Sequence, residues 1–373
     1  MKITSVDVTV VAVPYKPEVG AIVTAGLVLT EARHVLVALH TDEGLTGIGE
    51  AVPRPSVYGE TVDSIRAALR DLLVPPILGA EALDVERMWE RWVRVIGNTT
   101  AKAALDMACH DLQGRAANLP LYKLLGGYAN EPLPLTMPIA IASDEEVLDQ
   151  ARRAVDTGYA GVKLKVGKGL RRDVRAVERV REAIGDELLL YVDANQGYGT
   201  SDALKAAAAF ARIGVDLLEE PVSGANTLGR ARIAQTGQVP LLLDESIQGL
   251  PDAVREIGLG TAGAFSVRSP RTGITLSKKL VGLADAAEVP CLVGSHRELG
   301  VATAASAHLA AAFAAMTYPS ELGVHTLLTD GLLAEPLEIA GGRLTLPAGP
   351  GLGVDLDPGR VDKHRVGDVL TIS

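Results

Sequence analysis

The sequence has few aromatic residues, no excess of basic residues and no long apolar run. Phe, Trp and Tyr make up 3% of the 373 residues, which argues against a stacking surface for single-stranded nucleic acid. Lys and Arg total 36 against 46 Asp and Glu, so the formal net charge is −10. Nucleic acid and anionic membranes attract basic surfaces, and no segment approaches the ~18 apolar residues that cross a bilayer. We therefore expect neither a nucleic-acid partner nor a membrane partner.

Cysteine is equally scarce. Cys109 and Cys291 stand far apart in the sequence, which excludes a disulfide framework or a CxxC metal site. The opening MKITSVDVTVVAVP alternates polar and apolar residues and lacks the apolar core of a signal peptide. Hydrophobic residues reach 47%, which is enough for a large core. These features predict a folded protein of the reducing cytoplasm.

The first part of the chain has strand patterns followed by helix patterns. The first ~50 residues predict an antiparallel meander, in which HVLVALHTDEGLTGIGEA supplies two strands joined by a turn at Asp-Glu-Gly. Helical patterns follow, and this order favours an α+β unit. We predict an α+β capping domain over residues 1–127, completed by the Gly- and Pro-rich tail at 345–373. The predicted helices cover residues 60–73, 84–95 and 101–117.

Residues 128–344 alternate between strand and helix patterns. The polar residues that end five of the strands follow one another at intervals of 24 to 28 residues in the sequence. This regular spacing predicts parallel strands with right-handed crossovers, and six or more such strands favour a closed α/β barrel. An open doubly wound sheet is the alternative, but no Gly-rich phosphate loop follows the first strand. The strand candidates are GVKLKV (161–166), LLLYVDA (188–194), VDLLEEP (215–221), VPLLLDE (239–245), GAFSVRS (263–269) and VPCLVGS (289–295).

The residues at these strand ends form a chemically consistent set. Lys163 and Lys165 point to the same side of their strand, because side chains alternate along it. Asp193, Glu219 and Asp244 end the next three strands, and their charges repel one another unless a divalent cation lies between them. Oxygen ligands suit Mg²⁺, or Mn²⁺, better than Zn²⁺. Any one of these residues taken alone has a simpler explanation, as a helix cap, a turn residue or a solvated charge.

The motifs that carry these residues, KLKVG, YVDANQ, LLEEP and LLLDES, closely resemble those of the enolase superfamily, in its muconate lactonizing (muconate cycloisomerase) and mandelate racemase-like branch. The resemblance implies an α+β capping domain on a TIM-like (β/α)7β barrel, and a homo-oligomer. It implies that Asp193, Glu219 and Asp244 bind Mg²⁺ or Mn²⁺. It also implies that Lys165, with Lys163 beside it, exchanges a proton at the carbon next to a metal-bound carboxylate.

One position departs from the family pattern. Many members carry a second catalytic lysine at the end of the sixth barrel strand, where AFSVRSPRTGIT places Arg268. Arginine stays protonated at any relevant pH and cannot serve as a base. A racemase or epimerase with two bases is therefore disabled on one face, whereas a reaction with a single proton-transfer residue survives. Packing of Arg268, or its pairing with a neighbouring carboxylate, is compatible with this reading.

The remaining candidate site residues, together with Arg268, are candidate contacts for a small carboxylate substrate. Arg54 and Tyr58 lie in VPRPSVYGET, a loop after the hairpin that is placed to fold over the barrel mouth. His296 and Glu298 lie in GSHRELGVATAASAH, which resembles the seventh-strand segment of the family, and Asn195 lies in YVDANQ. Each of the loop residues is equally well explained as a solvated surface residue. The acidic total describes the exterior, and the site itself suits an anionic substrate.

Three functions compete at this point. The first is a cycloisomerase of aromatic catabolism that forms muconolactone from cis,cis-muconate, or the lactone of a related diacid, through a metal-stabilised enolate. The second is another reaction of the superfamily: a one-base acid dehydratase, or a dipeptide or N-acylamino acid epimerase or racemase with an altered second base. The third is a barrel that keeps a metal and has lost its chemistry. The absence of a second lysine favours the first.

Overall fold

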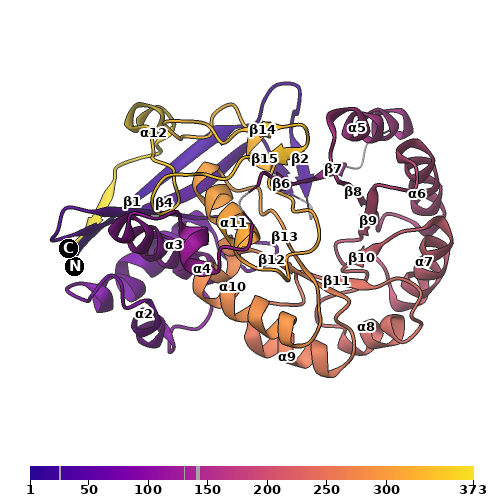
Figure 1. The fold of residues 1–373 in the computed structure, drawn as a ribbon, viewed down its shortest axis with the longest axis horizontal. Coiled ribbons are helices and arrows are strands. Elements are labelled where there is room, and N and C mark those ends of the chain that lie inside the picture. Colours follow the sequence, from indigo (N-terminus) through magenta and orange to yellow (C-terminus); the bar gives the residue numbers. More distant parts are fainter. Residues whose placement is uncertain (25–26, 130, 140–142) are drawn as a thin grey trace.

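The computed structural model describes residues 1–24, 27–129, 131–139 and 143–373, and it contains two main sheets (Figure 1). The first is antiparallel, with the strand order β16-β1-β4-β5. The predicted meander and its turn at 42–45 are confirmed, because β4 and β5 pair as a hairpin. The C-terminal strand β16 pairs with β1, so the two chain ends lie side by side. The strands are β1 (Ile3–Pro14), β4 (Glu31–Thr41), β5 (Thr46–Ala51) and β16 (Leu370–Ile372).

Helices α1 to α4 follow β5 along the chain; α1, α2 and α3 lie near the three predicted ranges, and the short α4 was not predicted. A capping box at Thr61 begins α1, and a π-helix over Leu69–Leu73 extends it. The Ala-rich α3 packs directly on β5, and a Cβ at Gly49 would overlap the carbonyl oxygen of Ala104. Glycine therefore permits this close approach of strand and helix. The helices are α1 (Val62–Ala68), α2 (Val85–Trp92), α3 (Thr99–Ala117) and α4 (Leu121–Leu125).

The second sheet is parallel and runs through the described part of residues 136–293 in the order β13-β12-β11-β10-β9-β8-β7. The six strands predicted from the spacing are all present in chain order, so the expectation of successive parallel strands is confirmed. The strand β7 was missed, because it lies in the proline-containing stretch EPLPLTMP. The strands are β7 (Thr136–Ile139), β8 (Gly161–Lys165), β9 (Leu189–Asp193), β10 (Leu217–Glu219), β11 (Leu241–Leu243), β12 (Ala264–Val267) and β13 (Cys291–Val293).

The extended segment 317–321 lies between the two edges of this sheet. The amide of Glu321 donates to Val293 of β13 at 2.8 Å, and the amide of Thr136 in β7 donates to Ser320 at 3.0 Å. Helices connect the strands, and Figure 1 shows α5 to α9 as an arc on the outside of the sheet. The connecting helices are α5 (Asp144–Thr157), α6 (Leu170–Ile184), α7 (Thr200–Ile213), α8 (Thr227–Ala234), α9 (Leu250–Gly258), α10 (Ser269–Ala286) and α11 (Gly300–Ala312).

Residues on the parallel strands alternate between two apolar cores. Leu190 and Val192 of β9 belong to the core shared with the helices. Tyr191 belongs to a smaller cluster with Leu217 and Leu242 of the two neighbouring strands, on the inner side of the sheet. Because side chains alternate along a strand, the odd positions of β8, β9 and β10 and the even positions of β11 and β12 face inward. The predicted site residues continue these inward rows at the carboxyl ends of the strands.

A buried carboxylate joins the helices that follow the two sheets. Asp106 of α3 accepts hydrogen bonds from the amides of Ile274 and Thr275, in the middle of α10. The helix α10 is kinked there, because Gly273 has φ of 65°, and a Cβ at Gly273 would lie 2.5 Å from the Asp106 carboxylate. Glycine is required on both counts.

The shorter elements lie in the connections and in the C-terminal part. They are β2 (Ile22–Thr24), β3 (Leu27–Leu29), β6 (Leu133–Pro134), β14 (Ile339–Ala340), β15 (Arg343–Leu344) and α12 (Pro358–His364), with 3₁₀ turns at Pro75–Ile77 and Val324–Leu327. Within the described ranges, no helix has both the length and the apolar character to span a membrane.

Candidate active site

Lys163 lies at the bottom of the site, under the carboxyl ends of the parallel strands. Its side chain is fully buried, and its Nζ lies 3.0 Å from Asp193 Oδ2, 2.7 Å from Glu219 Oε2 and 2.8 Å from Glu321 Oε1. Tyr191 donates a hydrogen bond of 2.6 Å to the same Glu321 oxygen. Although burial favours the neutral amine, the three carboxylates raise the pKa of Lys163 well above its ordinary value. Lys163 is therefore a fixed ammonium ion.

Lys165 lies one layer above Lys163 and reaches the mouth of the site. Its Nζ donates to Asp193 Oδ2 at 2.5 Å and to Asn195 Oδ1 at 2.7 Å. Burial favours the protonated form of Asp193, but the ammonium groups of Lys163 and Lys165 outweigh this effect and lower its pKa to about 2. Asn195 has φ of 40°, and its amide nitrogen donates to Glu245 at 3.2 Å. The two lysines thus share one face and one carboxylate, as their spacing predicts.

Arg268 lies across the site from Lys165 and binds Asp244 with two nitrogens. Its Nε lies 2.6 Å from Asp244 Oδ1, and its Nη2 donates to Asp244 Oδ2. Arg271 donates to Oδ1 and to the main-chain oxygen of Asp244, at 2.8 Å each. Burial favours the protonated form of Asp244, but the two guanidinium groups outweigh this effect and lower its pKa below the ordinary range. Asp244 is therefore an ionised carboxylate held by two buried cations.

The carboxyl groups next to Asp244 are crowded. Glu219 is fully buried, and its Oε2 lies 2.7 Å from the ammonium group of Lys163. Burial, together with the charge of Asp193, raises the pKa of Glu219 well above its ordinary value. Burial and the charge of Asp244 raise the pKa of Glu245 to about 8. A bound cation would neutralise the repulsion between these carboxyl groups and so favour their ionised form.

These carboxylates are also the residues that would hold a metal ion. Within the described ranges, no three or more His, Cys, Asp or Glu side chains are grouped so that they could hold a metal ion. Lys163 and Arg268 pair with the carboxylates instead. The chemistry of the donor set nevertheless fits a hard divalent cation, since Asp193, Glu219 and Asp244 end three adjacent strands and offer only oxygen. The burial and crowding of these carboxylates, which raise the pKa of Glu219 well above its ordinary value, agree with that fit.

The loop at 52–61 covers the site from the side of the antiparallel sheet. The hydroxyl of Tyr58 lies 2.6 Å from Nε2 of His296, which follows β13. Burial lowers the pKa of His296 well below its ordinary value, and Arg268 and Arg54 add to this effect. Arg54 Nε and Arg297 Nη1 are buried without hydrogen-bond partners among the described residues. Burial and the nearby Arg54 lower the pKa of Arg297 to about 10, so cations gather at this edge.

Glu298 does not join the lysine pair. Its carboxylate accepts hydrogen bonds from the amide of His296 at 2.6 Å and from the hydroxyl of Ser295 at 3.1 Å. Burial raises its pKa to about 7. These contacts stabilise the loop after β13, in which Arg297 has φ of 66°. Backbone strain of this kind is common where a loop presents functional side chains.

Three residues of the site were missed in the sequence: Glu245, Arg271 and Glu321. Glu245 directly follows Asp244 in LLLDES, and Arg271 lies one helical turn beyond Arg268, so both were within reach of the motifs. Glu321 lies in MTYPSELG, which has neither a long apolar run nor a place in the regular strand spacing. Glu321 could have been found only by asking which further carboxylate, besides Asp193 and Glu219, balances the charge of the buried Lys163.

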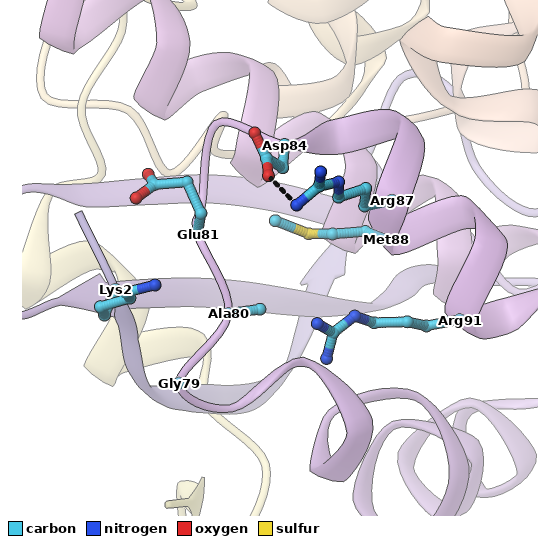
Figure 2. Close-up of a pocket in the computed structure, with 8 residues that line it drawn as sticks. All are labelled: Lys2, Gly79, Ala80, Glu81, Asp84, Arg87, Met88 and Arg91. Carbon is cyan, nitrogen blue, oxygen red and sulfur yellow. Dashed lines mark ion pairs between the residues drawn. The ribbon is translucent and has the colours of Figure 1, made fainter.

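Two surface cavities lie away from these residues. Figure 2 shows the smaller one, of about 150 Å³, where Arg87 and Arg91 of α2 face Lys2, Glu81 and Asp84. The larger one, of about 660 Å³, lies beside α12 and is lined by His325, Asp330 and Arg360, among others. Neither is lined by a predicted site residue.

A parallel α/β sheet with lysines, carboxylates and arginines at the carboxyl ends of its strands has the architecture of the barrel enzymes. Comparison with known families agrees. Residues 4–126 match the family model "Mandelate racemase / muconate lactonizing enzyme, N-terminal domain", and residues 146–360 match "Enolase C-terminal domain-like". The chain belongs to the mandelate racemase and muconate lactonizing enzyme family of the enolase superfamily, and its expected resemblance to that family is confirmed.

Known relatives have more than one activity. The chain is 32% identical to an N-succinyl-L-Arg/Lys racemase of Bacillus cereus over 83% of this chain and 84% of the relative. It is also 32% identical to a chloromuconate cycloisomerase of Cupriavidus pinatubonensis, over 88% and 91%. A muconate lactonizing enzyme of Pseudomonas fluorescens, solved with muconolactone, superposes with a TM-score of 0.92 at 28% identity, covering 98% of this chain and 99% of that one. The chain is therefore an enzyme of this superfamily, with cycloisomerases and racemases among its relatives.

Proposed function

We propose that this protein is a metal-dependent cycloisomerase that forms a lactone from cis,cis-muconate or a related diacid. The observation that carries the proposal is the asymmetry of the site. Lys165 ends β8 on one side, and Arg268 directly follows β12, four strands away in the sheet order. Arginine cannot take up a proton, so this site supports a reaction that uses one proton-transfer residue. Lactone formation from a diacid needs one proton only.

In the proposed reaction, the substrate closes to a lactone and Lys165 supplies the proton. An oxygen of one substrate carboxylate forms a bond to the β-carbon of the double bond conjugated with the other carboxylate. The electron pair of that double bond moves to the α-carbon, which then takes a proton from the ammonium group of Lys165. Lys163 cannot replace Lys165, because the three surrounding carboxylates hold its proton. Its fixed charge keeps Asp193 and Glu219 in position.

We further propose that Asp193, Glu219 and Asp244 hold the metal ion, Mg²⁺ or Mn²⁺. A divalent cation supplies positive charge next to the substrate carboxylate whose α-carbon gains electron density. Glu220 supports this set from behind, since its carboxylate accepts the amide of Asp244 at 2.7 Å and the amide of Ser246 at 2.9 Å. The crowding that raises the pKa of Glu219 supports a need for added positive charge.

We assign the second carboxylate of the substrate to the loop at 52–61 (the lid) and to the loop after β13. Arg54 and Arg297 present buried nitrogens without partners in the described part of the chain, and Tyr58 carries a hydroxyl beside His296. Guanidinium groups bind carboxylates with two hydrogen bonds. The two arginines and the tyrosine hydroxyl therefore suit a substrate with two carboxylates better than a substrate with one. Asn195 would orient Lys165, whose Nζ it already accepts at 2.7 Å.

A second candidate is an elimination or epimerisation that uses Lys165 as its single base. The relative from Bacillus cereus named as a racemase favours keeping this candidate, and the lack of a base at Arg268 disfavours it for a two-base racemisation. With N-succinylated amino acids in D₂O, a single base would exchange the α-proton of one enantiomer only. Exchange of both enantiomers would contradict the proposed role of Arg268.

The direct test of the proposal is turnover. The purified protein, treated with EDTA and then given Mn²⁺ or Mg²⁺, should consume cis,cis-muconate, with loss of the diene absorbance and appearance of muconolactone by NMR. The EDTA-treated protein should be inactive, and Asp193→Asn should stay inactive after metal is added. Absence of muconate turnover, together with formation of a keto product from hydroxy acids, would instead identify a dehydratase.

The organisation expected from the sequence remains part of the proposal. We propose that residues 1–127 and 345–373 form the capping domain and residues 128–344 the barrel, with 317–321 as the eighth strand of a (β/α)7β count. The pairing of β16 with β1 and the hydrogen bonds of Glu321 and Thr136 support this division. From its membership of this family, we also propose that the protein is a cytoplasmic homo-oligomer that works in aromatic catabolism.

A further inference from the structure

We propose that Arg268 is an internal cation that competes with the metal ion for the carboxylate of Asp244. The metal affinity of this chain is then set by the release of a guanidinium group as well as by the three carboxylates. The inference rests on the metal site of the proposed function, and it concerns the one position where the chain departs from the lysine of its family.

The contacts of Arg268 carry the inference. Its Nε lies 2.6 Å from Asp244 Oδ1, and its Nη2 donates to Oδ2 of the same carboxylate. The same Nη2 lies 3.4 Å from Glu219 Oε1, and Nη1 donates to the main-chain oxygen of Ser295. Arg268 thus engages two of the three proposed metal ligands, and its side chain is only 5% exposed.

Charge and geometry both make this contact an obstacle to a metal ion. A buried, bidentate guanidinium–carboxylate pair is among the strongest hydrogen-bonded ion pairs in proteins, and both oxygens of Asp244 are committed to it. A dication that binds Asp193 and Glu219 would also lie close to the guanidinium charge and repel it, with little screening in a buried site. Metal binding must therefore break part of the Arg268–Asp244 pair.

Lysine at this position would present a weaker obstacle. An ammonium group is a compact charge on a flexible stem and lacks the planar fork that matches both carboxylate oxygens. Arg271 also donates to Asp244 Oδ1 at 2.8 Å, but its contacts with the main-chain oxygens of Asp244 and Ser266 hold it in place, so this contact is the same whichever residue stands at position 268. We therefore expect weaker metal binding with arginine at position 268 than with lysine.

The experiment measures Mn²⁺ binding to metal-free protein, by the EPR signal of free Mn²⁺ and by calorimetry. Arg268→Met removes the competing cation and should bind Mn²⁺ at least tenfold more tightly than the wild type. Arg268→Lys should lie between the two. The control is Arg230→Met, because Arg230 also forms a fully buried bidentate pair, with Glu256 at 2.7 and 3.0 Å. Arg230 contacts none of the proposed ligands, so this variant should leave the affinity unchanged.

The outcomes separate this inference from the proposed function. If wild type binds Mn²⁺ in an Asp193-dependent way and Arg268→Met and Arg268→Lys bind it no more tightly, the competition is wrong and the metal site stands. If neither wild type nor any variant binds Mn²⁺, both the metal site and the competition are wrong. Where Arg268→Met fails to fold by circular dichroism, the ratio between Arg268→Lys and wild type decides, because lysine keeps the charge: tighter binding supports the competition, and equal or weaker binding overturns it.

Discussion

The hydroxyl of Tyr58 lies 2.6 Å from Nε2 of His296, and this contact joins the loop over the site to the end of the seventh parallel strand. Burial raises the pKa of Tyr58 to about 12, and burial with the nearby arginines lowers the pKa of His296 well below its ordinary value. Both groups are therefore neutral near pH 7, and the contact is a hydrogen bond between two neutral groups whichever ring nitrogen carries the proton. The hydrogen bond ties the loop at 52–61 to the segment after β13 without adding charge to the site.

Tyr58→Phe should weaken substrate capture more than it weakens the fold. One neutral hydrogen bond contributes about 1 kcal/mol, which corresponds to a loss of about fivefold in kcat/KM if the lid must close before the reaction. Steady-state kinetics with the diacid substrate would measure it. Tyr128→Phe, at an exposed tyrosine, is the matched control and should leave the kinetics unchanged. An equal kcat/KM for Tyr58→Phe and wild type would contradict the role of this contact.

Lys163→Met should destabilise the protein strongly. The substitution leaves Asp193, Glu219 and Glu321 without the ammonium ion that lies within 3.0 Å of all three. Removal of one partner from a buried ion pair costs about 3–5 kcal/mol, measured by urea unfolding at neutral pH. Part of the loss should be recovered at low pH, where the carboxylates become neutral.

The control for this variant is Lys168→Met, which removes a lysine from an exposed position in the same segment. It should change the free energy of unfolding by less than about 0.5 kcal/mol. A Lys163→Met protein as stable as Lys168→Met would mean that the three carboxylates find another counter-charge.

Glu298→Gln should change how stability depends on pH. Burial raises the pKa of Glu298 from 4.5 to about 7, so the folded protein binds an extra proton between these values. The contribution of Glu298 to stability is then fully present below about pH 4.5 and is lost as the pH rises through 7. Glutamine imitates the protonated acid and can accept the same hydrogen bonds from Ser295 and the amide of His296.

Urea unfolding at pH 5 and pH 8 tests this prediction. The variant should gain stability relative to wild type as the pH rises, by about 3 kcal/mol at most. Parallel pH dependences for the two proteins would show that Glu298 titrates at its ordinary value in the folded state.

Much of the architecture was predictable because it follows from local rules. The spacing of Lys165, Asp193, Glu219, Asp244 and Arg268 predicted successive parallel strands, and these are the strands β8 to β12. The alternation of side chains along a strand predicted that the lysines share a face, and both contact Asp193. Such patterns depend on residues close in the sequence, so one sequence suffices to find them.

Contacts between distant segments were not predictable in the same way. Glu321 meets Lys163 across 158 positions of sequence, and no local pattern marks it. Asp106 reaches the kink at Gly273 from a different helix. For Arg268, the sequence indicated a lost base and left open whether the side chain packs or pairs. The pairing with Asp244 depends on how closely two neighbouring strands bring their ends together, which is a property of the assembled sheet.

The central claim is that Lys165 alone transfers the proton, and deuterium labelling tests it most directly. With metal present, cis,cis-muconate converted in D₂O should give a lactone with one deuterium on a single face of the new CHD carbon, read by NMR. Lys165→Ala, folded by circular dichroism, should give no labelled lactone. Deuterium on both faces, or labelled lactone from Lys165→Ala, would contradict the account.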